Sequence, residues 1–303
     1  MKKISIAICT DENYALNGAM AIYSASKNIA EDTRIDAYIL DSGIRTVTRK
    51  RFERILRRPN IELFWLKPNL DAIDHLPISP WTTKAANARL ILPELLSDKT
   101  DKVLYLDSDM LVIGDVSELL DYPLEGKCLL ACLDGKYPTV QCSRASKVLT
   151  EMGLNPQTPY FNSGLLMINV KRWENMETTK RMAKLLEEKG VFFTHKDQDG
   201  LNFILQEEWG QLDNSWNVCT SRFDSDDQND RRITQEAKII HFTGKPPGLI
   251  GCRHPKRELF YKYVKDSNWF SNIEFFLWRT NLEIRDSVYF SIKRVRSLVR
   301  NKK

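Results

Sequence analysis

Apolar runs of strand length alternate with segments of helical periodicity along the first hundred residues of the chain. The expected strands are Lys3–Cys9, Ile35–Leu40, Ile61–Leu66 and Lys102–Leu106, and the expected helices are Ala15–Ala30, Thr48–Leu56 and Asn87–Leu96. Such alternation, with about 10–15 residues in each helix, is typical of an α/β fold with a largely parallel sheet. Because ligands of these sheets bind at the carboxyl ends of the strands, polar residues that directly follow the apolar runs are candidates for a site.

The pattern is less regular in the second half of the chain. We expect strands over Gly164–Val170 and Lys238–Phe242, and helices over Lys171–Glu188 and Asp199–Gln206. The polar run Asp224–Arg232 is expected to be a loop. These elements extend the same mostly parallel, mixed sheet rather than starting a second repeat.

Length and composition fit one large domain with an appendage. The chain has 303 residues, of which 42% are hydrophobic, enough for a sizeable core. We assign residues 1–265 to the domain and residues 266–303 to a C-terminal helical, basic appendage. No apolar run reaches the roughly 18–20 residues of a membrane-spanning helix. Asp11 and Glu12 end the N-terminal apolar run too early for a signal peptide, so a first strand is the better interpretation.

The six cysteines are spread along the chain without CxxC spacing. This pattern favours neither a disulfide framework nor a zinc site, and it indicates a reducing, cytoplasmic location.

The net charge of +5 belongs to the C-terminal segment. Residues 274–303 contain eight Lys or Arg and three Asp or Glu, which accounts for the whole excess. The domain therefore has no general basic field, and we expect no nucleic-acid partner.

The same segment has apolar residues at helical spacing with cations between them. The apolar positions include Val288, Ile292, Val295 and Val299, and the cations include Lys293 and Arg294. This pattern is typical of a basic amphipathic helix on an anionic membrane. A helix packed on the domain, with a solvated cationic face, is the alternative. We expect peripheral association with the inner face of the membrane.

The stretch VLYLDSDMLV, residues 103–112, places two carboxylates at the end of a buried strand. Asp-x-Asp occurs three times in the chain, but only Asp107 and Asp109 directly follow such a strand and precede another apolar segment. Carboxylates are costly to bury without a counter-charge, and a divalent cation is the usual one. A paired structural or helix-capping role is the alternative.

Two chemistries use such a pair of acids. In a glycosyltransferase the acids hold a metal that bridges the two phosphates of a nucleotide-sugar. In an aspartate-dependent phosphohydrolase the first acid attacks phosphorus and the second transfers a proton. The acids alone do not decide between these reactions, and a binding protein without activity is a third possibility.

Seven segments, taken in their order and at their separations, resemble glycosyltransferase family 8. They are CTDENYA (9–15), NARLILPELL (87–96), DKVLYLDSDMLV (101–112), ACLDG (131–135), YFNSGLLMINVKRW (160–173), HKDQDGLN (195–202) and IIHFTGKP (239–246). The family includes bacterial lipooligosaccharide galactosyltransferases, lipopolysaccharide hexosyltransferases and glycogenin, and the resemblance covers about residues 3–265. It implies a GT-A fold, a single nucleotide-binding α/β domain. Phosphatases of the competing type carry their acids on the first strand, whereas over a hundred residues precede Asp107.

The resemblance implies a metal-dependent, retaining transfer of a hexose, galactose or glucose, from a UDP-sugar to a glycan acceptor such as lipopolysaccharide or capsule. Asp107, Asp109 and His241 would hold the metal. Two carboxylates and an imidazole suit Mn²⁺ better than Mg²⁺, although Mg²⁺ can substitute. Ser108, between the two acids, belongs to the nucleotide-sugar site.

The resemblance also assigns the donor site. Asp11, Asn13 and Tyr14 would bind uridine, with Tyr14 stacked on uracil; capping of the helix that follows is the alternative. Arg89 would reach the donor sugar or diphosphate, and Asn162 the donor sugar.

Asp134 is expected to contact the acceptor or sugar, with a turn-forming Asp-Gly as the alternative. Many family members carry a diphosphate-binding lysine beyond the histidine, but an ungapped alignment places Pro247 there. Lys245, beside Gly244, is the nearby cation that could replace it.

Asp197 and Gln198 are expected to form the chemical centre. By resemblance, Gln198 lies where a nucleophile would lie in a retaining transfer. Because an amide oxygen is a poor nucleophile, Gln198 is expected to stabilise the oxocarbenium-like charge or to position the acceptor. Asp197 would bind sugar hydroxyls. The sequence leaves open a front-face or a double-displacement route.

Overall fold

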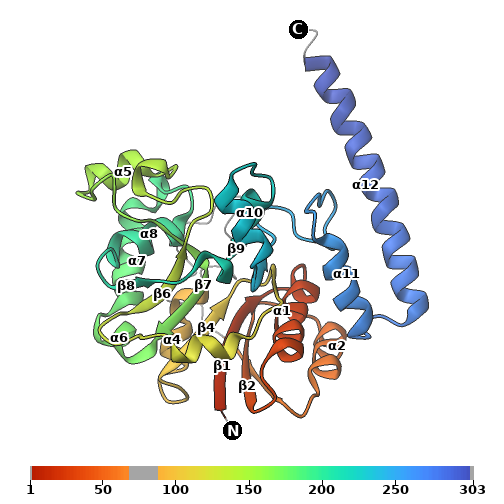
Figure 1. Ribbon diagram of the computed structural model, residues 1–303, viewed down its shortest axis with the longest axis horizontal. Coiled ribbons are helices and arrows are strands. Elements are labelled where there is room, and N and C mark those ends of the chain that lie inside the picture. The colour runs from red at the N-terminus through yellow and green to blue at the C-terminus, as the bar shows by residue number, and fades with distance from the viewer. Residues whose placement is uncertain (1, 68–87, 301–303) are drawn as a thin grey trace.

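The computed structural model describes residues 2–67 and 88–300, and it contains a seven-stranded sheet in the order β3-β2-β1-β4-β7-β6-β8 (Figure 1). The strands are β1 (Lys2–Thr10), β2 (Thr33–Asp41), β3 (Ile61–Leu66), β4 (Lys102–Leu106), β6 (Leu129–Leu133), β7 (Phe161–Asn169) and β8 (Trp209–Gln211). All pairings are parallel except those of β7, which runs antiparallel to both β4 and β6. The predicted α/β fold with a mostly parallel mixed sheet is confirmed.

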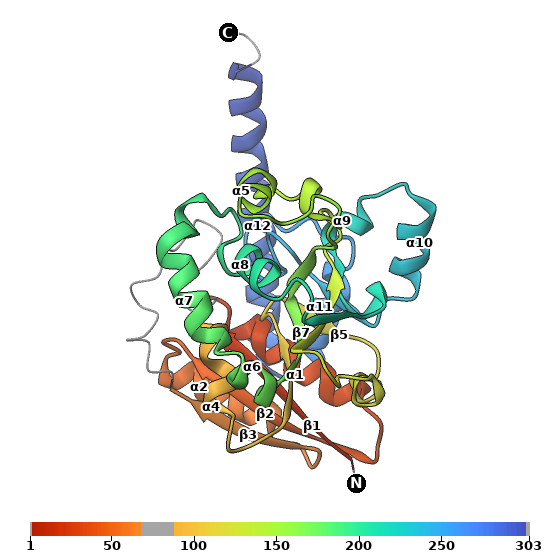
Figure 2. The same cartoon turned by 90° about the vertical axis from the view of Figure 1, so that its left-hand side faces the viewer.

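Helices cover both faces of this sheet (Figures 1 and 2). On one face lie α1 (Ala15–Asn28), α2 (Thr46–Leu56), α11 (Arg257–Asp266) and the start of α12 (Asn272–Arg300). On the other lie η1 (Ala88–Ile91), α4 (Leu92–Leu95), α5 (Ser146–Glu151), α6 (Val170–Asn175), α7 (Thr178–Lys189) and α8 (Lys196–Ile204). Alternate side chains of β1 enter the two cores: Ile6 and Ile8 face the first, and Ala7 and Cys9 the second.

A second, three-stranded sheet lies against the edge that carries the acids. β10 (Ile239–His241) is its central strand, between β5 (Met110–Val112) and β9 (Val218–Cys219). The antiparallel register places His241 opposite Met110, and the parallel one places it opposite Cys219. Pairing of three short segments therefore brings His241 beside Asp109 across 132 residues of sequence.

Three expectations are wrong in detail. The helix expected over Lys171–Glu188 is broken into α6 and α7, because Glu177 adopts a left-handed conformation with φ 50°. The segment Asp224–Arg232 is not all loop: α10 (Gln228–Gln235) begins there, and the Asp227 carboxylate accepts from the amides of Asn229 and Asp230 as an N-cap.

The helix expected over Asn87–Leu96 is a 3₁₀ turn, η1, followed by the short α4; Asn87 lies outside the described residues. The short strands β6, β8 and β9 were not expected. Each is only two to five residues long, so its pattern is too brief to identify a strand.

The helix α12 is the long C-terminal helix expected from the sequence. Its first half is anchored: Leu282 is buried in the first core, and the Trp278 ring packs at 5.6 Å from that of Tyr261. Its second half extends beyond the body of the molecule (Figures 1 and 2). The side chains of Val295 and Val299 lie outside the described residues. Within residues 2–67 and 88–300, no helix has the apolar length needed to cross a membrane.

Candidate active site

The two acids that end β4 are held by specific partners. The Tyr105 hydroxyl donates to Asp107 Oδ1 at 2.7 Å, and the Arg89 guanidinium forms an ion pair with the same oxygen at 3.1 Å. The amide of Asp107 donates to the carbonyl of Gly164 at 2.8 Å, which fixes the strand end against β7. The Asp109 carboxylate lies 3.2 Å from His241 Nε2. The carboxylates therefore point to one place above the sheet.

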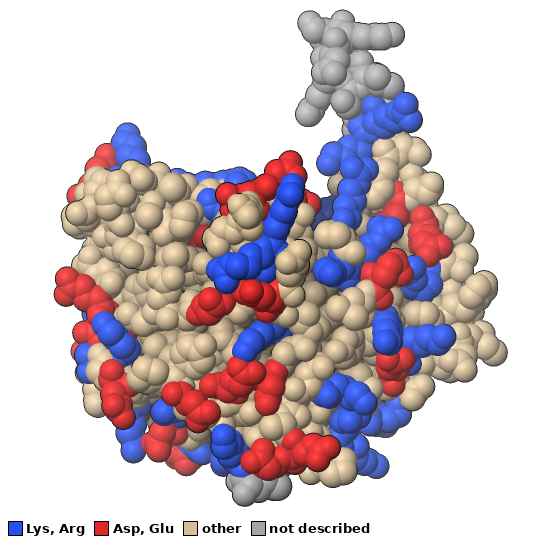
Figure 3. All heavy atoms as spheres, in the orientation of Figure 1, with Lys and Arg blue, Asp and Glu red and all other residues tan. Residues whose placement is uncertain are grey.

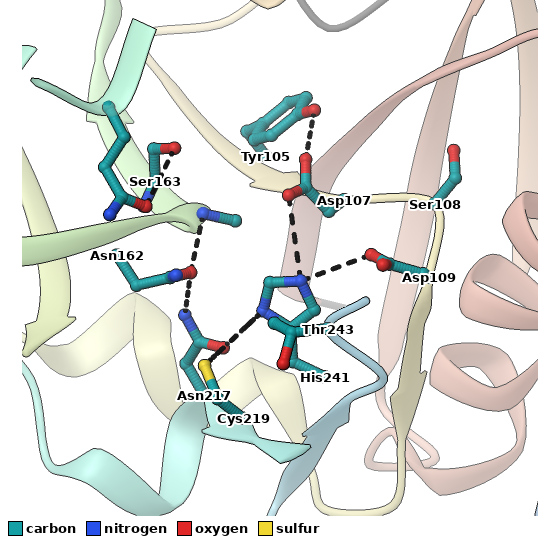
Figure 4. A network of polar contacts seen from close by, with 12 residues as sticks. Tyr105, Asp107, Ser108, Asp109, Asn162, Ser163, Asn217, Cys219, His241 and Thr243 are labelled. Carbon is teal, nitrogen blue, oxygen red and sulfur yellow. Dashed lines mark hydrogen bonds and ion pairs between the residues drawn. The ribbon is translucent and has the colours of Figure 1, made fainter. Parts of the chain in front are cut away.

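Asp107, Asp109 and His241 form a cluster with the chemistry of a metal site (Figure 4). One ligand atom from each lies within 4.8 Å of the other two. His241 Nε2 faces both carboxylates, at 3.2 Å from Asp109 and 3.8 Å from Asp107, while Nδ1 lies 2.9 Å from the Asn217 amide oxygen. An imidazole held at one nitrogen and aimed at two carboxylates with the other is the usual arrangement of a histidine metal ligand.

The charges of this cluster favour a cation. Burial is the largest single influence on His241 and lowers its pKa, but the charge and hydrogen bond of Asp109, together with the contact with Cys219, raise the pKa well above the ordinary value. Burial and the carboxylates of Asp109, Asp11 and Asp107 raise the pKa of Tyr14 to about 12. Both shifts report a concentration of negative charge at this edge, which a divalent ion would neutralise.

Arg89 joins this cluster to the start of α8. Its Nε lies 3.1 Å from Asp197 Oδ2, and its third nitrogen donates to the Ser163 carbonyl at 3.0 Å. Arg89 is 8% exposed and Asp197 5%. Burial raises the pKa of Asp197, and the Arg89 guanidinium lowers it in part. The buried Arg89 guanidinium therefore holds Asp107, at the end of β4, together with Asp197, in the first turn of α8.

Gln198 lies in a buried network of amides and one carboxylate. Its Oε1 accepts from the Ser163 amide at 3.0 Å, and its Nε2 donates to Asp134 Oδ2 at 3.2 Å. The same Asp134 oxygen accepts from Asn162 Nδ2 at 3.0 Å, while Asp134 Oδ1 accepts from the amides of Lys136 and Tyr137. Asp134 thus forms the turn that its Asp-Gly sequence suggested and also orients two site amides.

The candidate uridine residues follow β1. Asp11 Oδ1 accepts from the amides of Asn13 and Tyr14 at 2.9 and 3.0 Å, so Asp11 does hold the turn before α1. Asn13 lines a cavity of about 360 Å³ whose wall also includes Gly248. Ser108 is buried and donates to the Cys9 carbonyl at 2.7 Å. This hydrogen bond joins the carboxyl end of β1 to the residues that follow β4, beneath the site.

Gly244 and Lys245 lie three and four residues after His241. Gly244 has φ 99° and open space where a Cβ would lie. The Lys245 ammonium donates to the Tyr289 hydroxyl at 3.1 Å and lies 4.3 Å from the centre of its ring. The cation expected at the diphosphate is therefore in contact with α12.

Several residues of the site were not predicted from the sequence. Tyr105, Ser163 and Gly164 lie inside segments that carry the resemblance, and their alternation with buried neighbours could have drawn attention to them. A Cβ on Gly164 would lie 2.4 Å from His241 Cε1 and 2.9 Å from Asp107 Oδ2, so glycine is required there. Asn217 lies in no motif, and only the structure reveals its contact with His241.

Residues 5–246 match the profile of glycosyl transferase family 8. The chain belongs to this family. Family 8 membership decides between the two reactions that the acid pair allows, in favour of the glycosyltransferase. The chain is therefore a glycosyltransferase of the hexosyltransferase type that uses a sugar donor and an acceptor, and Asp107, Asp109 and His241 are its candidate metal ligands.

Relatives within family 8 span most of the chain. General stress protein A of Bacillus subtilis is 27% identical over 278 residues, covering 87% of this chain and 94% of the relative. Lipopolysaccharide 1,3-galactosyltransferase of Salmonella typhimurium is 26% identical over 278 residues, covering 88% and 79%. The crystal structure of the galactosyltransferase LgtC with donor and acceptor sugar analogues matches with a TM-score of 0.73 at 26% identity, covering 87% and 96%. The GT-A fold expected for this family 8 member is thereby confirmed.

Replacement of Gly164 tests the packing of the family 8 site. Gly164→Ala should reduce sugar transfer at least tenfold, because the new methyl group displaces the His241 ring or the Asp107 carboxylate. Overpacking of this kind also costs about 1–3 kcal/mol of stability. Donor hydrolysis and thermal unfolding measure the two effects.

Gly210→Ala is the matched control, since its Cβ would lie 2.6 Å from Leu130 Cδ2, away from the site. It should lower stability and leave hydrolysis nearly unchanged. Full activity of a folded Gly164→Ala enzyme would contradict the packing described above.

Proposed function

We propose that the protein transfers galactose or glucose from a UDP-sugar, with retention of anomeric configuration, to a bacterial surface glycan such as lipopolysaccharide or capsule. The observation that carries this proposal is the cluster of Asp107, Asp109 and His241, which Arg89 links to Asp197 and Gln198. Metal ligands and the expected chemical centre thus meet at one edge of the sheet.

The ligand set fits Mn²⁺, with Mg²⁺ as a substitute, because it combines two carboxylates with an imidazole. When bound, the ion would neutralise negative charge on the diphosphate leaving group. The protein positions the three ligands. Tyr105 and Arg89 fix Asp107, the β5–β10 register fixes His241 beside Asp109, and Gly164 leaves room between them.

The donor is bound along the carboxyl ends of β1 and β4. Tyr14 is proposed to stack on uracil, a contact worth about 1–3 kcal/mol per base, with Asp11 and Asn13 at the base edge. Ser108, between the acids, and Gly244, with its open approach, border the diphosphate. Lys245 is the cation proposed to reach it.

Arg89, Asp197 and Asn162 are proposed to bind the hydroxyls of the donor sugar. All three are at least nine-tenths buried, so hydroxyls that replace water there meet fixed partners. Asp134 is proposed to contact the acceptor or the sugar through the carboxylate that already orients Asn162 and Gln198.

In the reaction the bond from the anomeric carbon to the diphosphate oxygen breaks, a bond to the acceptor oxygen forms, and the acceptor proton is released. Gln198 Oε1 already accepts one hydrogen bond, from the Ser163 amide, and its Nε2 is held by Asp134. An amide held at both ends is poorly placed to become covalently attached. These contacts support a role in which Gln198 stabilises positive charge at the anomeric carbon.

The function is tested with UDP-galactose and UDP-glucose in the presence and absence of Mn²⁺. We expect slow, Mn²⁺-dependent hydrolysis of one donor without an acceptor, and a product anomer that retains the donor configuration by proton NMR. A generic phosphatase substrate should not be hydrolysed. Turnover of that substrate without turnover of either donor would contradict the proposal.

Asp109→Asn should lower transfer by about a hundredfold or more, since metal stabilisation of the leaving group contributes several kcal/mol. Asp107→Asn should do the same and should also lose some stability, because Asp107 pairs with the buried Arg89. Asp226→Asn is the control: Asp226 lies in another Asp-x-Asp sequence and, among residues 2–67 and 88–300, forms an ion pair only with the exposed Arg231. Near-normal turnover of either site variant at saturating Mn²⁺ would refute the metal assignment.

Gln198→Ala should lower kcat by roughly a hundredfold and change the donor KM little, because its contact strengthens only as charge develops in the transition state. Steady-state kinetics over a range of donor concentrations measure both constants. Gln206→Ala, at an exposed position just beyond α8, should leave both unchanged. Loss of donor affinity with normal kcat would make Gln198 a binding residue only.

We propose that residues 266–303 form an appendage to the catalytic domain of residues 1–265 and bind the anionic inner face of the membrane. Six exposed, large apolar side chains lie on α12: Ile273, Phe276, Leu277, Ile284, Val288 and Ile292. Most follow one another at intervals of four or seven residues, so they form a stripe along the helix. An apolar stripe on a basic helix supports binding at the membrane surface.

Cations accompany this stripe (Figure 3). A cleft of about 520 Å³ between α12 and the loop before α11 is lined by Arg253, Ser287, Phe290, Ser291, Lys293 and Arg294. Among the described residues, no carboxylate pairs with these three cations. The cleft can therefore accept lipid phosphate groups at the level of the stripe.

The double variant Lys293→Gln, Arg294→Gln tests this surface without disturbing the core that Leu282 and Trp278 help to form. Each cation near an anionic membrane contributes about 1 kcal/mol, so binding to anionic vesicles should weaken roughly thirtyfold. Hydrolysis of the donor should not change. Co-sedimentation with anionic and neutral vesicles across a salt series measures the binding.

Lys147→Gln, Lys189→Gln is the matched control, since it removes two exposed cations from α5 and α7, the helices that lie on the other side of the molecule from α12 (Figure 1). It should bind anionic vesicles as the wild type does. Equal weakening by both double variants would show that net charge, rather than α12, governs the binding.

A further inference from the structure

Asn217 is almost completely buried, with 1% of its surface exposed, between η5 (Asn214–Trp216) and β9. Pairing of β9 with β10 places Cys219 opposite His241 and brings Asn217 beside the imidazole. The two ends of the Asn217 amide contact different partners. One lies 2.9 Å from His241 Nδ1 and the other 2.9 Å from Asn162 Oδ1.

Backbone amides determine which way each side-chain amide in this network points. The Gly164 N–H can only donate, so the Asn162 atom that faces it at 3.0 Å is an oxygen. Asn162 Oδ1 in turn requires a donor from Asn217, so the Asn217 nitrogen faces Asn162 and its oxygen faces His241. Gln198 is oriented in the same way by the Ser163 N–H.

The orientation of Asn217 has a consequence for His241. An amide oxygen only accepts hydrogen bonds, so His241 Nδ1 has to carry the hydrogen that it shares with Asn217. The neutral ring then has its lone pair on Nε2, the atom that faces Asp109 and Asp107 (Figure 4). A chain of fixed amides that begins at the Gly164 backbone therefore selects the ligand nitrogen.

We propose that Asn217 is a positioning residue that fixes the tautomer and ring orientation of His241 as a metal ligand. This inference rests on the proposed metal site. The network also reaches Gln198: Asn162 donates to Asp134 Oδ2, and Gln198 Nε2 donates to the same oxygen. Asn217 thus joins the metal-ligating imidazole to the amide of the chemical centre through buried groups.

Cys219 is the other polar group near His241 Nδ1. Its sulfur lies 3.9 Å from that nitrogen, longer than the 2.9 Å of Asn217 Oδ1. A thiol is also a weak acceptor. The amide oxygen is therefore the partner that orients the ring.

The test is calorimetric titration of Mn²⁺ into metal-free protein, without donor or acceptor. Asn217→Leu removes the acceptor at similar volume and should weaken Mn²⁺ binding about 10–100-fold, as loss of an outer-shell partner does. Asn217→Asp keeps an acceptor for the Nδ1 hydrogen and should retain most of the affinity. Thermal unfolding of each variant records whether the fold is intact.

Two controls separate positioning from packing. Cys219→Ala should bind Mn²⁺ as the wild type does. Asn60→Leu removes a partly buried amide that bonds the Ser26 carbonyl near the amino end of β3, and it should lower stability without changing Mn²⁺ affinity.

Unchanged Mn²⁺ affinity of Asn217→Leu, or equal loss in Asn217→Leu and Asn217→Asp, would overturn the inference. If Asn217→Leu does not fold, Asn217→Ser replaces it, since its short hydroxyl cannot reach His241, and the same criteria apply. Absence of Mn²⁺ binding by the wild type would instead refute the metal site itself, so the two failures are distinguishable.

Discussion

The guanidinium of Arg89 lies between the half-buried carboxylate of Asp107 and the buried carboxylate of Asp197, and it donates to the Ser163 carbonyl near the start of β7. Without a counter-charge, the carboxylates of Asp107 and Asp197 would repel each other and lose part of their hydration. Arg89 supplies part of that charge in a geometry that its planar fork can satisfy with three partners at once. It therefore joins η1, β4, β7 and α8, and the donor-site groups keep their positions because this one cation lies among them.

The second half of the site depends on strand register. β10 is only three residues long, yet it pairs on one side with β5 and on the other with β9. A shift of one residue would turn His241 to the opposite face of the small sheet and take it away from Asp109. Ile239 and Ile240 are both completely buried and oppose such a shift, since it would displace each side chain from the neighbours that it packs against. A few apolar side chains thus specify where the imidazole lies.

The sequence predicted five strands of the main sheet and the helices that precede residue 60, because long periodic segments are local patterns. The acid pair after a strand indicated Asp107 and Asp109, whereas His241 was assigned through the family resemblance. It did not predict the break between α6 and α7, because the left-handed residue there is Glu177 and not a glycine. It also did not predict that Asp227 caps α10. Asn217 was also missed. Its role depends on contacts with residues 24 and 55 positions away in the chain, and a single asparagine beside a tryptophan carries no local signal for either. The sequence identified Lys245 but could not show that its ammonium contacts Tyr289.

That contact belongs to a larger attachment between α12 and the loop after β10. The Gly251 amide donates to the Asp286 carboxylate, and the Arg253 guanidinium lies 3.8 Å from the centre of the Phe290 ring. The loop that follows His241, the candidate metal ligand, is therefore in contact with the helix that carries the apolar stripe. Thermodynamic coupling between two binding events is reciprocal. If a diphosphate draws Lys245 away from Tyr289, as proposed, it would change the free energy with which α12 is held, and docking of α12 on a surface would change the donor affinity by the same factor.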